Sequence, residues 1–130
     1  MDATMMLVLD YLIKELNKDE KFLNAIRDWS VRLLIEIIPD LDIPYLYRVY
    51  MEIENGKLID IRVLDPEDEA EADIIITMPL SVYEGMMTGE MSMIKAFLKR
   101  KIKVRGKKGE LMKRKKALEI LNQKMREIMF

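Results

Sequence analysis

The sequence predicts one α+β domain, because segments with the period of helices and segments with the period of strands both occur within its 130 residues. Apolar residues recur at helical spacing near both ends of the chain, over residues 2–16 and 111–128. Residues 45–63 and 102–105 alternate apolar and polar side chains, and residues 74–76 are three consecutive isoleucines. Half of the residues are apolar, so a chain of this length can bury a core without disulfides.

The first 40 residues are predicted to be helical. Residues 2–16 place polar side chains opposite a broad apolar stripe formed by Met5, Met6, Val8, Leu9, Leu12, Ile13 and Leu16. A second helix, ending before Pro39, is predicted from apolar residues at steps of three and four: Phe22, Ile26, Trp29, Leu33 and Ile37. The segment Pro39 to Pro44 reads as a hinge. We therefore expect an N-terminal helical segment, residues 1–40, and a second part, residues 41–130, within one compact unit.

Residues 45–63 are predicted to form a β-hairpin whose register follows from side-chain parity. A two-residue turn at Asn55-Gly56 would set Met51 opposite Asp60, mixing apolar and charged residues on one face. A three-residue loop, residues 54–56, instead gives a uniform apolar face, with the pairs Met51 and Ile59, Val49 and Ile61, and Tyr47 and Val63. The opposite face is then predicted to be exposed to solvent, and it carries Arg48, Tyr50, Glu52, Asp60 and Arg62.

An acidic connector, Asp65 to Glu71, leads into the central part of the chain. It lacks the glycine and the glutamate that a calcium-binding loop needs at its sixth and twelfth positions, so it is predicted to be a charged loop. The next segment, Ala72 to Met78, is predicted to be a strand buried on both faces.

Two short helices and a strand are predicted to follow. Pro79 starts the first helix and Gly89 ends it, and Ser92 caps the second. Residues 102–105 are predicted to form a strand with one face exposed to solvent. After Gly109, a last helix should close the core with the apolar face formed by Leu111, Leu118, Leu121, Met125 and Ile128.

The central segment carries a resemblance to a known family. The order and spacing of Ala72-Asp73, Gly89-Glu90, Ala96-Phe97-Leu98 and the run 101–106 resemble the sterol carrier protein (nonspecific lipid-transfer, SCP-2-like) family, over roughly residues 45–125. Arg100 stands where that family usually has a glycine. The resemblance implies an antiparallel or mixed sheet covered on one face by short helices, a C-terminal helix, and an apolar cavity for a fatty acid, an acyl-CoA or a sterol-like ligand.

Methionines crowd the same central segment. The chain has 12, and five lie between residues 78 and 93. Their flexible side chains suit either a pocket or an ordinary core, and periodicity alone leaves the two interpretations even. The resemblance favours a pocket, with Tyr83 as its polar group. The predicted ligand-binding residues are Ile74, Ile76, Met78, Tyr83, Met86, Met87, Met93, Phe97, Ile102 and Val104.

Basic residues are concentrated between Lys95 and Lys116, although the whole chain is nearly neutral, with 22 basic and 23 acidic residues. A solvated face, neutralised by the acidic connector and by Glu15, Glu20 and Glu36, is the first interpretation. An anionic membrane surface or the phosphates of coenzyme A come second, and nucleic acid is disfavoured because Phe97 is the only aromatic ring in the segment. The predicted anionic-surface residues are Lys99, Arg100, Lys101, Lys103, Arg105, Lys107 and Lys108.

Histidine and cysteine are both absent, which removes the commonest general base, the thiol nucleophile and most transition-metal ligands. No catalytic residue, metal site or cofactor is predicted. The leading hypothesis is therefore a noncatalytic lipid-binding carrier. The alternatives are a protein-interaction module of the same fold with a filled core, with a homodimer through the leading helices, and a nucleic-acid binder. A cytoplasmic location is expected, because the N-terminus lacks a secretory pattern and its apolar run, Met5 to Leu9, is too short to span a membrane.

Overall fold

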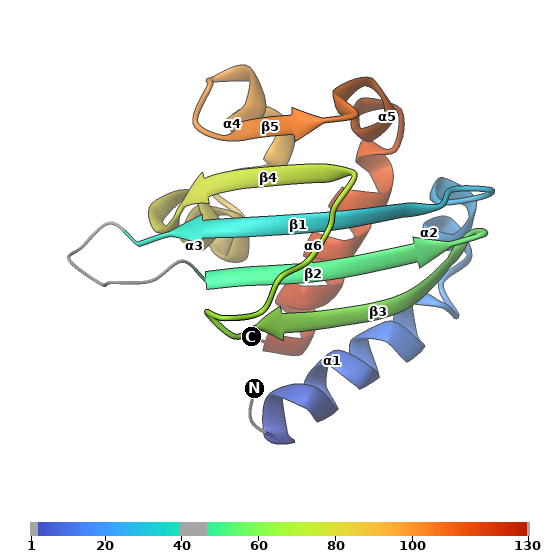
Figure 1. The fold of residues 1–130 in the computed structure, drawn as a ribbon. Helices are drawn as coiled ribbons and strands as arrows, with labels where there is room; N and C mark the ends of the chain where they lie inside the picture. The colour runs from blue at the N-terminus through green and yellow to red at the C-terminus, as the bar shows by residue number, and fades with distance from the viewer. Residues whose placement is uncertain (1–2, 40–46, 130) are drawn as a thin grey trace.

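The structure, a computed structural model, describes residues 3–39 and 47–129 as a mixed β-sheet with helices on one face (Figure 1). In chain order the helices and strands are α1 (Ala3–Leu16), α2 (Glu20–Ala25), β1 (Val31–Ile38), β2 (Tyr47–Glu54), β3 (Lys57–Leu64), β4 (Ile74–Pro79), α3 (Leu80–Thr88), α4 (Met93–Leu98), β5 (Lys103–Gly106), α5 (Lys108–Lys113) and α6 (Lys115–Met129). Residues 40–46, which include most of the predicted hinge and the predicted start of the hairpin, lie outside the described part.

The five strands are ordered β3-β2-β1-β4-β5, and only the β1–β4 pair is parallel. In Figure 1 α3 and α6 lie behind the sheet and α1 lies below it, and the chain that joins β3 to β4 crosses in front of it. The prediction of a mixed sheet covered on one face by helices is confirmed. No helix among the described residues is long and apolar enough to cross a membrane.

The prediction of a second helix that continues to Ile37 is correct only for its first part. Only α2 is helical, and residues 31–38 form β1, the central strand, which pairs with both β2 and β4. The reason is that Val31–Ile38 is apolar on both sides, with only Arg32 and Glu36 polar, and it is rich in β-branched residues. Leu33 faces the main core and Leu34 the opposite face, and both are buried, so a strand with two covered faces is more stable here than a helix with one.

The hairpin register also differs from the prediction. The turn is the two-residue Asn55-Gly56 form, with Glu54 paired to Lys57 and both turn residues at positive φ, 47° and 76°. A bulge between Leu58 and Asp60 then inserts Ile59 and shifts the pairing by one residue. Beyond the bulge Met51 pairs with Ile61 and Val49 with Val63, so the uniform apolar face is achieved by the bulge and not by a longer loop.

The opposite face of the hairpin is not uniformly exposed as predicted. Tyr50 is only 5% exposed, because it packs with Leu34 and Leu64 beneath the chain that joins β3 to β4. The guanidinium of Arg48 donates hydrogen bonds to the carbonyls of Asp65 and Asp68, which holds the acidic connector (residues 65–71) across this face. The outer face of the sheet therefore carries a small second core.

The strand–helix–helix–strand prediction is confirmed. Gly89, with φ 86°, ends α3, and the Ser92 side chain caps α4 by accepting a hydrogen bond from Lys95 N. Arg100 adopts φ 57°, a left-handed conformation that glycine tolerates best, at the position where the resemblance expects a glycine.

The last predicted helix is divided at Arg114 into α5 and α6. The guanidinium of Arg114 donates to the carbonyl of Ala25 at 3.1 Å and lies 5.6 Å from the centre of the Trp29 ring, which holds the break against α2 and β1. The predicted apolar face is confirmed: Leu111, Leu118 and Leu121 are buried, and Met125 and Ile128 pack against the core.

Candidate functional site

An apolar pocket of about 110 Å³ lies between the helical face of the sheet and the helices α1, α3 and α6. Each lining strand except β4 contributes alternate residues, and each lining helix contributes residues from one stripe. The pocket is lined by Met5, Val8, Leu9, Leu12, Ile35, Ile37, Tyr47, Val49, Met51, Ile61, Val63, Met78, Tyr83, Met86, Met87, Met93, Leu118, Leu121, Asn122, Met125 and Ile128.

Half of the predicted ligand-binding residues lie in this lining: Met78, Tyr83, Met86, Met87 and Met93. Ile74 and Ile76 share a face of β4 with Met78 but are completely buried in the core, farther from the pocket. Phe97, Ile102 and Val104 line a different, shallow hollow along β5. The structure therefore brings the C-terminal end of β4, α3 and the start of α4 together at the pocket, and it places the other five residues elsewhere.

Most of the remaining lining comes from α1, β1, β2, β3 and α6, which the sequence argument assigned to the core or to a covering helix. The sequence does show the apolar faces of these helices and strands, but the pattern of an apolar face is the same whether it packs against a filled core or lines a cavity. Asn122 offered a sharper signal. It is a single amide on the apolar face of the last helix, between Leu121 and Met125, and its Nδ2 donates to the carbonyl of Met86 at 3.2 Å.

Three side chains supply polar atoms to the lining, namely Asn122, Tyr47 and Tyr83. Burial raises the pKa of Tyr83 above its ordinary value, and the neighbouring Tyr47 raises it further. The Tyr83 hydroxyl is therefore neutral at physiological pH. Tyr47 is 40% exposed, so it lies at the rim where the pocket meets solvent. The pocket can hold an apolar body and offer it a few uncharged hydrogen-bonding groups.

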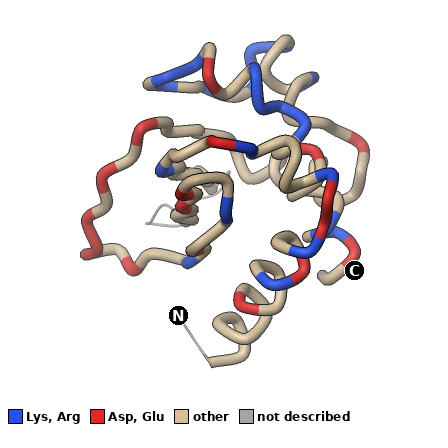
Figure 2. The backbone as a smooth tube through the Cα atoms, turned by 90° about the vertical axis from the view of Figure 1, so that its right-hand side faces the viewer, with Lys and Arg blue, Asp and Glu red and all other residues tan. Residues whose placement is uncertain are grey.

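The seven predicted anionic-surface residues form what we call the basic face, which covers β5, the segment between α4 and β5, and the start of α5, and all seven are exposed. Figure 2 shows Lys and Arg gathered there, at the end of the molecule far from the N-terminus. Within the described residues, Arg105 is the only one of the seven with an ion pair, to Glu36 at 3.0 Å. Leu98, which is 71% exposed, adds an apolar side chain to the hollow that this face surrounds.

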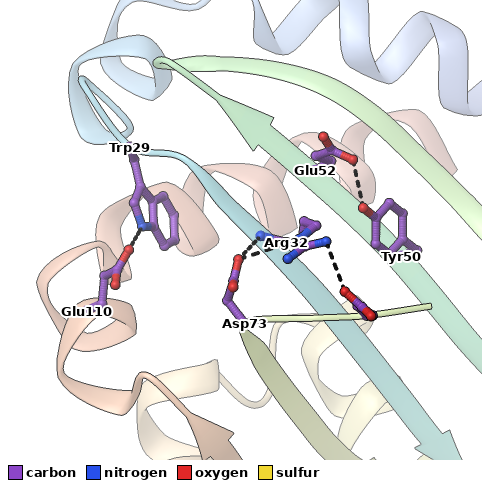
Figure 3. A network of polar contacts seen from close by, with 7 residues as sticks. Trp29, Arg32, Tyr50, Glu52, Asp73 and Glu110 are labelled. Atoms are coloured by element: carbon purple, nitrogen blue, oxygen red, sulfur yellow. Dashed lines mark hydrogen bonds and ion pairs between the residues drawn. The ribbon is translucent and has the colours of Figure 1, made fainter.

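Of the acidic groups expected to neutralise the basic face, Glu36 does so by its ion pair with Arg105, whereas no ion pair joins the acidic connector to this face among the described residues. Glu71 of the connector lies 3.7 Å from Arg32 of β1, and Asp73 accepts the backbone N–H of Arg32 at 2.9 Å (Figure 3). Glu71 at the end of the connector and Asp73 just after it therefore hold this part of the chain against β1. No group of three or more Asp and Glu side chains that could hold a metal ion occurs among the described residues.

The comparisons with known proteins agree on one family. A model of the SCP-2 sterol transfer family matches residues 9–119. A crystal structure of sterol carrier protein 2 superposes with a TM-score of 0.76 at 22% identity, covering 91% of this chain and 92% of that one. A Thermus thermophilus protein described as a possible sterol carrier protein gives 0.75 at 22% identity, covering 90% and 82%.

More distant structures share the fold. Sterol carrier protein 2 from Yarrowia lipolytica, in its apo form, gives a TM-score of 0.57 at 17% identity, covering 89% of this chain and 88% of that one. Part of a sec-alkyl sulfatase gives 0.53 at 15% identity, covering 88% of this chain and 16% of that one. No curated protein sequence matches this chain. Since the family model spans more than two thirds of the sequence, the chain belongs to the SCP-2 sterol transfer family.

Proposed function

We propose that this protein is a noncatalytic lipid carrier that holds one acyl chain or sterol-like body in the apolar pocket. Membership of the SCP-2 family supports lipid binding or transfer in general, and members of this family are generally carriers without catalytic activity. The observation that carries the proposal is the pocket itself, whose lining is apolar except for two tyrosine hydroxyls and one amide. Such a lining binds by burying apolar surface and gives loose specificity.

The pocket must widen to admit a long chain, because its 110 Å³ is in the range of cavities that hold a benzene-sized guest. Seven of the 12 methionines line it, and unbranched methionine side chains can rearrange at small cost. Burial contributes about 0.8 kcal/mol per methylene, so a chain of about twelve carbons can offset both this rearrangement and the cost of association.

Among the residues predicted from the sequence, we propose that Met78, Tyr83, Met86, Met87 and Met93 contact the lipid. Their place in the pocket lining supports this role. For the other five we propose a supporting role in the core and along β5, because they lie outside that lining.

The test is titration of the protein, first stripped of co-purified lipid, with the uncharged fluorescent probe N-phenyl-1-naphthylamine. Saturable binding in the micromolar range is expected. Met87→Asp should weaken it at least tenfold, because the new carboxylate would lie in the pocket wall. Thr88→Asp adds the same charge at an exposed position on the same helix and should leave binding unchanged.

Met87→Trp is a second variant, which fills the pocket without adding charge and should also reduce uptake. Folding of each variant is checked by circular dichroism and thermal unfolding. A stripped, folded wild-type protein that takes up no probe would contradict the carrier function. It would favour the protein-interaction module with a filled core.

We also propose that the basic face binds an anionic membrane surface. Six of its cations lack an ion pair within the described residues, and the exposed Leu98 lies among them. Each cation near an anionic bilayer contributes about 1 kcal/mol, and salt weakens that attraction. The protein would then contact the membrane through a surface that is separate from the pocket lining.

Co-sedimentation with vesicles tests this role. The protein should bind vesicles that contain phosphatidylglycerol at low salt, release at high salt, and ignore pure phosphatidylcholine. Lys99→Glu, Lys101→Glu and Lys103→Glu together should abolish binding, whereas the same charge reversal at the exposed Lys14, Lys18 and Lys21 should not. Equal loss in both triple variants, or preferential binding to duplex DNA in a gel shift, would contradict a specific membrane role for this face.

A further inference from the structure

We propose that the apolar pocket selects lipids with an uncharged, hydrogen-bonding head group, such as a long-chain alcohol or a sterol-like hydroxyl, over free carboxylates of the same length. This inference rests on the proposed carrier function and narrows its ligand class. It concerns the head group only, since the chain itself is recognised by apolar burial.

The first observation is that no charged side chain lines the pocket within the part of the chain that the structure describes. The basic face lies along β5 and the segments on either side of it, around a hollow that shares no residue with the pocket. Arg126, next to Met125 on α6, places its guanidinium against Gly89 at the end of α3 and does not belong to the lining. A carboxylate drawn into the pocket would therefore lose its water without gaining an ion pair, which strongly disfavours the charged form.

The second observation is that the polar atoms present suit a neutral partner. The amide of Asn122 uses Nδ2 to donate to the Met86 carbonyl, which leaves its Oδ1 as an acceptor for a hydroxyl. Tyr83 lies one turn before Met86 on α3, and its partly buried hydroxyl keeps its proton, so it can donate and accept. A hydroxyl head group can donate to Asn122 Oδ1 and can donate to or accept from Tyr83, whereas a carboxylate can only accept and meets the Asn122 oxygen unfavourably.

The experiment compares 1-dodecanol with dodecanoate, which share a chain length and differ in charge. Each displaces the uncharged fluorescent probe N-phenyl-1-naphthylamine from stripped wild-type protein at pH 8. Dodecanol should displace the probe at a concentration at least tenfold lower. Lowering the pH toward the acid's own pKa should then raise the apparent affinity for dodecanoate by up to about tenfold per unit, because the neutral acid is the form that binds. The affinity for dodecanol should not change with pH.

Two conservative variants locate the selectivity. Asn122→Leu and Tyr83→Phe keep the size of the side chains, so probe uptake should persist while the advantage of dodecanol over dodecanoate narrows several-fold. Tyr11→Phe removes the same hydroxyl at an exposed position outside the lining, so it is the control and should keep the full advantage.

The outcomes separate the two proposals. Probe uptake with equal displacement by the two lipids at pH 8, or with dodecanoate favoured, would overturn the selectivity and leave the carrier function standing. That result would mean that head groups stay in solvent at the rim. Failure of the folded protein to take up the probe at all would overturn the carrier function, and the selectivity with it.

Discussion

Gly106 lies so close to the backbone of Asp73 that no side chain fits there. A Cβ added at Gly106 would overlap the Asp73 carbonyl oxygen, and φ is 95° at this position. The same carbonyl accepts the N–H of Lys107, and the Asp73 carboxylate accepts the N–H of Arg32 in β1. This contact therefore fastens the end of β5 to the start of β4 and, through Asp73, to the central strand.

Gly106→Ala should lower the free energy of unfolding by about 2–4 kcal/mol, from backbone strain and forced displacement of Asp73. Urea denaturation followed by circular dichroism measures the change. Gly109→Ala is the matched control, because a Cβ there meets nothing within 4 Å, and it should be neutral or slightly stabilising. Similar midpoints for the two variants would contradict the proposed tight contact.

Tyr50 predicts a dependence of stability on alkaline pH. Burial, and then the hydrogen bond to Glu52 at 2.7 Å, raise its pKa to about 12 (Figure 3). The unfolded chain loses this proton near pH 10, before the folded state does. The stability contributed by the neutral phenol is therefore fully present below about pH 10 and is lost as the pH rises through about 12.

The measurement is the urea midpoint of wild type and Tyr50→Phe at pH 8 and at pH 11. The wild-type midpoint should fall more steeply between the two values, because phenylalanine has no proton to lose. Tyr11→Phe, at an exposed position, should behave like the wild type. An equal fall of the urea midpoint in wild type and Tyr50→Phe would show that Tyr50 does not cause the loss of stability at alkaline pH.

At the scale of elements, β1 and the hairpin show where sequence patterns are ambiguous. Phe22, Ile26 and Trp29 do face the core, as the helical spacing required, but Leu33 and Ile37 continue that spacing inside a strand. A strand buried on both faces has no polar face to reveal its period of two, so a stripe of period 3.6 can be found in it by chance. For the hairpin, only the register was predicted wrongly. The alternation of side chains correctly predicted a uniform apolar face, but it does not distinguish a longer loop from a bulge.

The central elements were predictable because their ends carry explicit signals. Pro79, Gly89 and Ser92 mark helix boundaries by their own conformational preferences, and all three do so in the structure. The pocket was predictable only in part. Met78, Met86 and Met87 could be proposed as pocket residues because methionines are concentrated in this segment of the sequence. Residues of α1 and β2 reach the same pocket only through tertiary packing. Local patterns cannot specify which apolar faces meet.

At the scale of the whole molecule, α1 and the basic face occupy opposite edges of the sheet. α1 packs along β3, and the basic face lies along β5 (Figure 1). The inner side of α1 forms pocket wall, and its outer side leaves Met6, Leu7 and Tyr11 at least half exposed. The expected dimer through the leading helices stays a prediction, and this outer side is where it would form.

Sedimentation equilibrium should show a reversible dimer, and Leu7→Glu should shift it to monomer. Lys14→Glu alters charge on the same helix without touching an apolar side chain and should leave the equilibrium in place. A wild-type protein that remains monomeric throughout the micromolar range would rule out the dimer.

Trp29 is the only tryptophan of the chain, and it lies where α2 gives way to β1. Its indole N–H donates to Glu110 of α5 (Figure 3), Arg114 lies over its ring, and neither it nor these two partners belongs to the pocket lining. Its emission therefore reports on the joint between the two ends of the chain and not directly on the contents of the pocket. Tyr47 and Tyr83, in contrast, lie in the wall and can transfer excitation to it. The molecule thus places two possible energy donors in the pocket wall and a single acceptor at a structural joint.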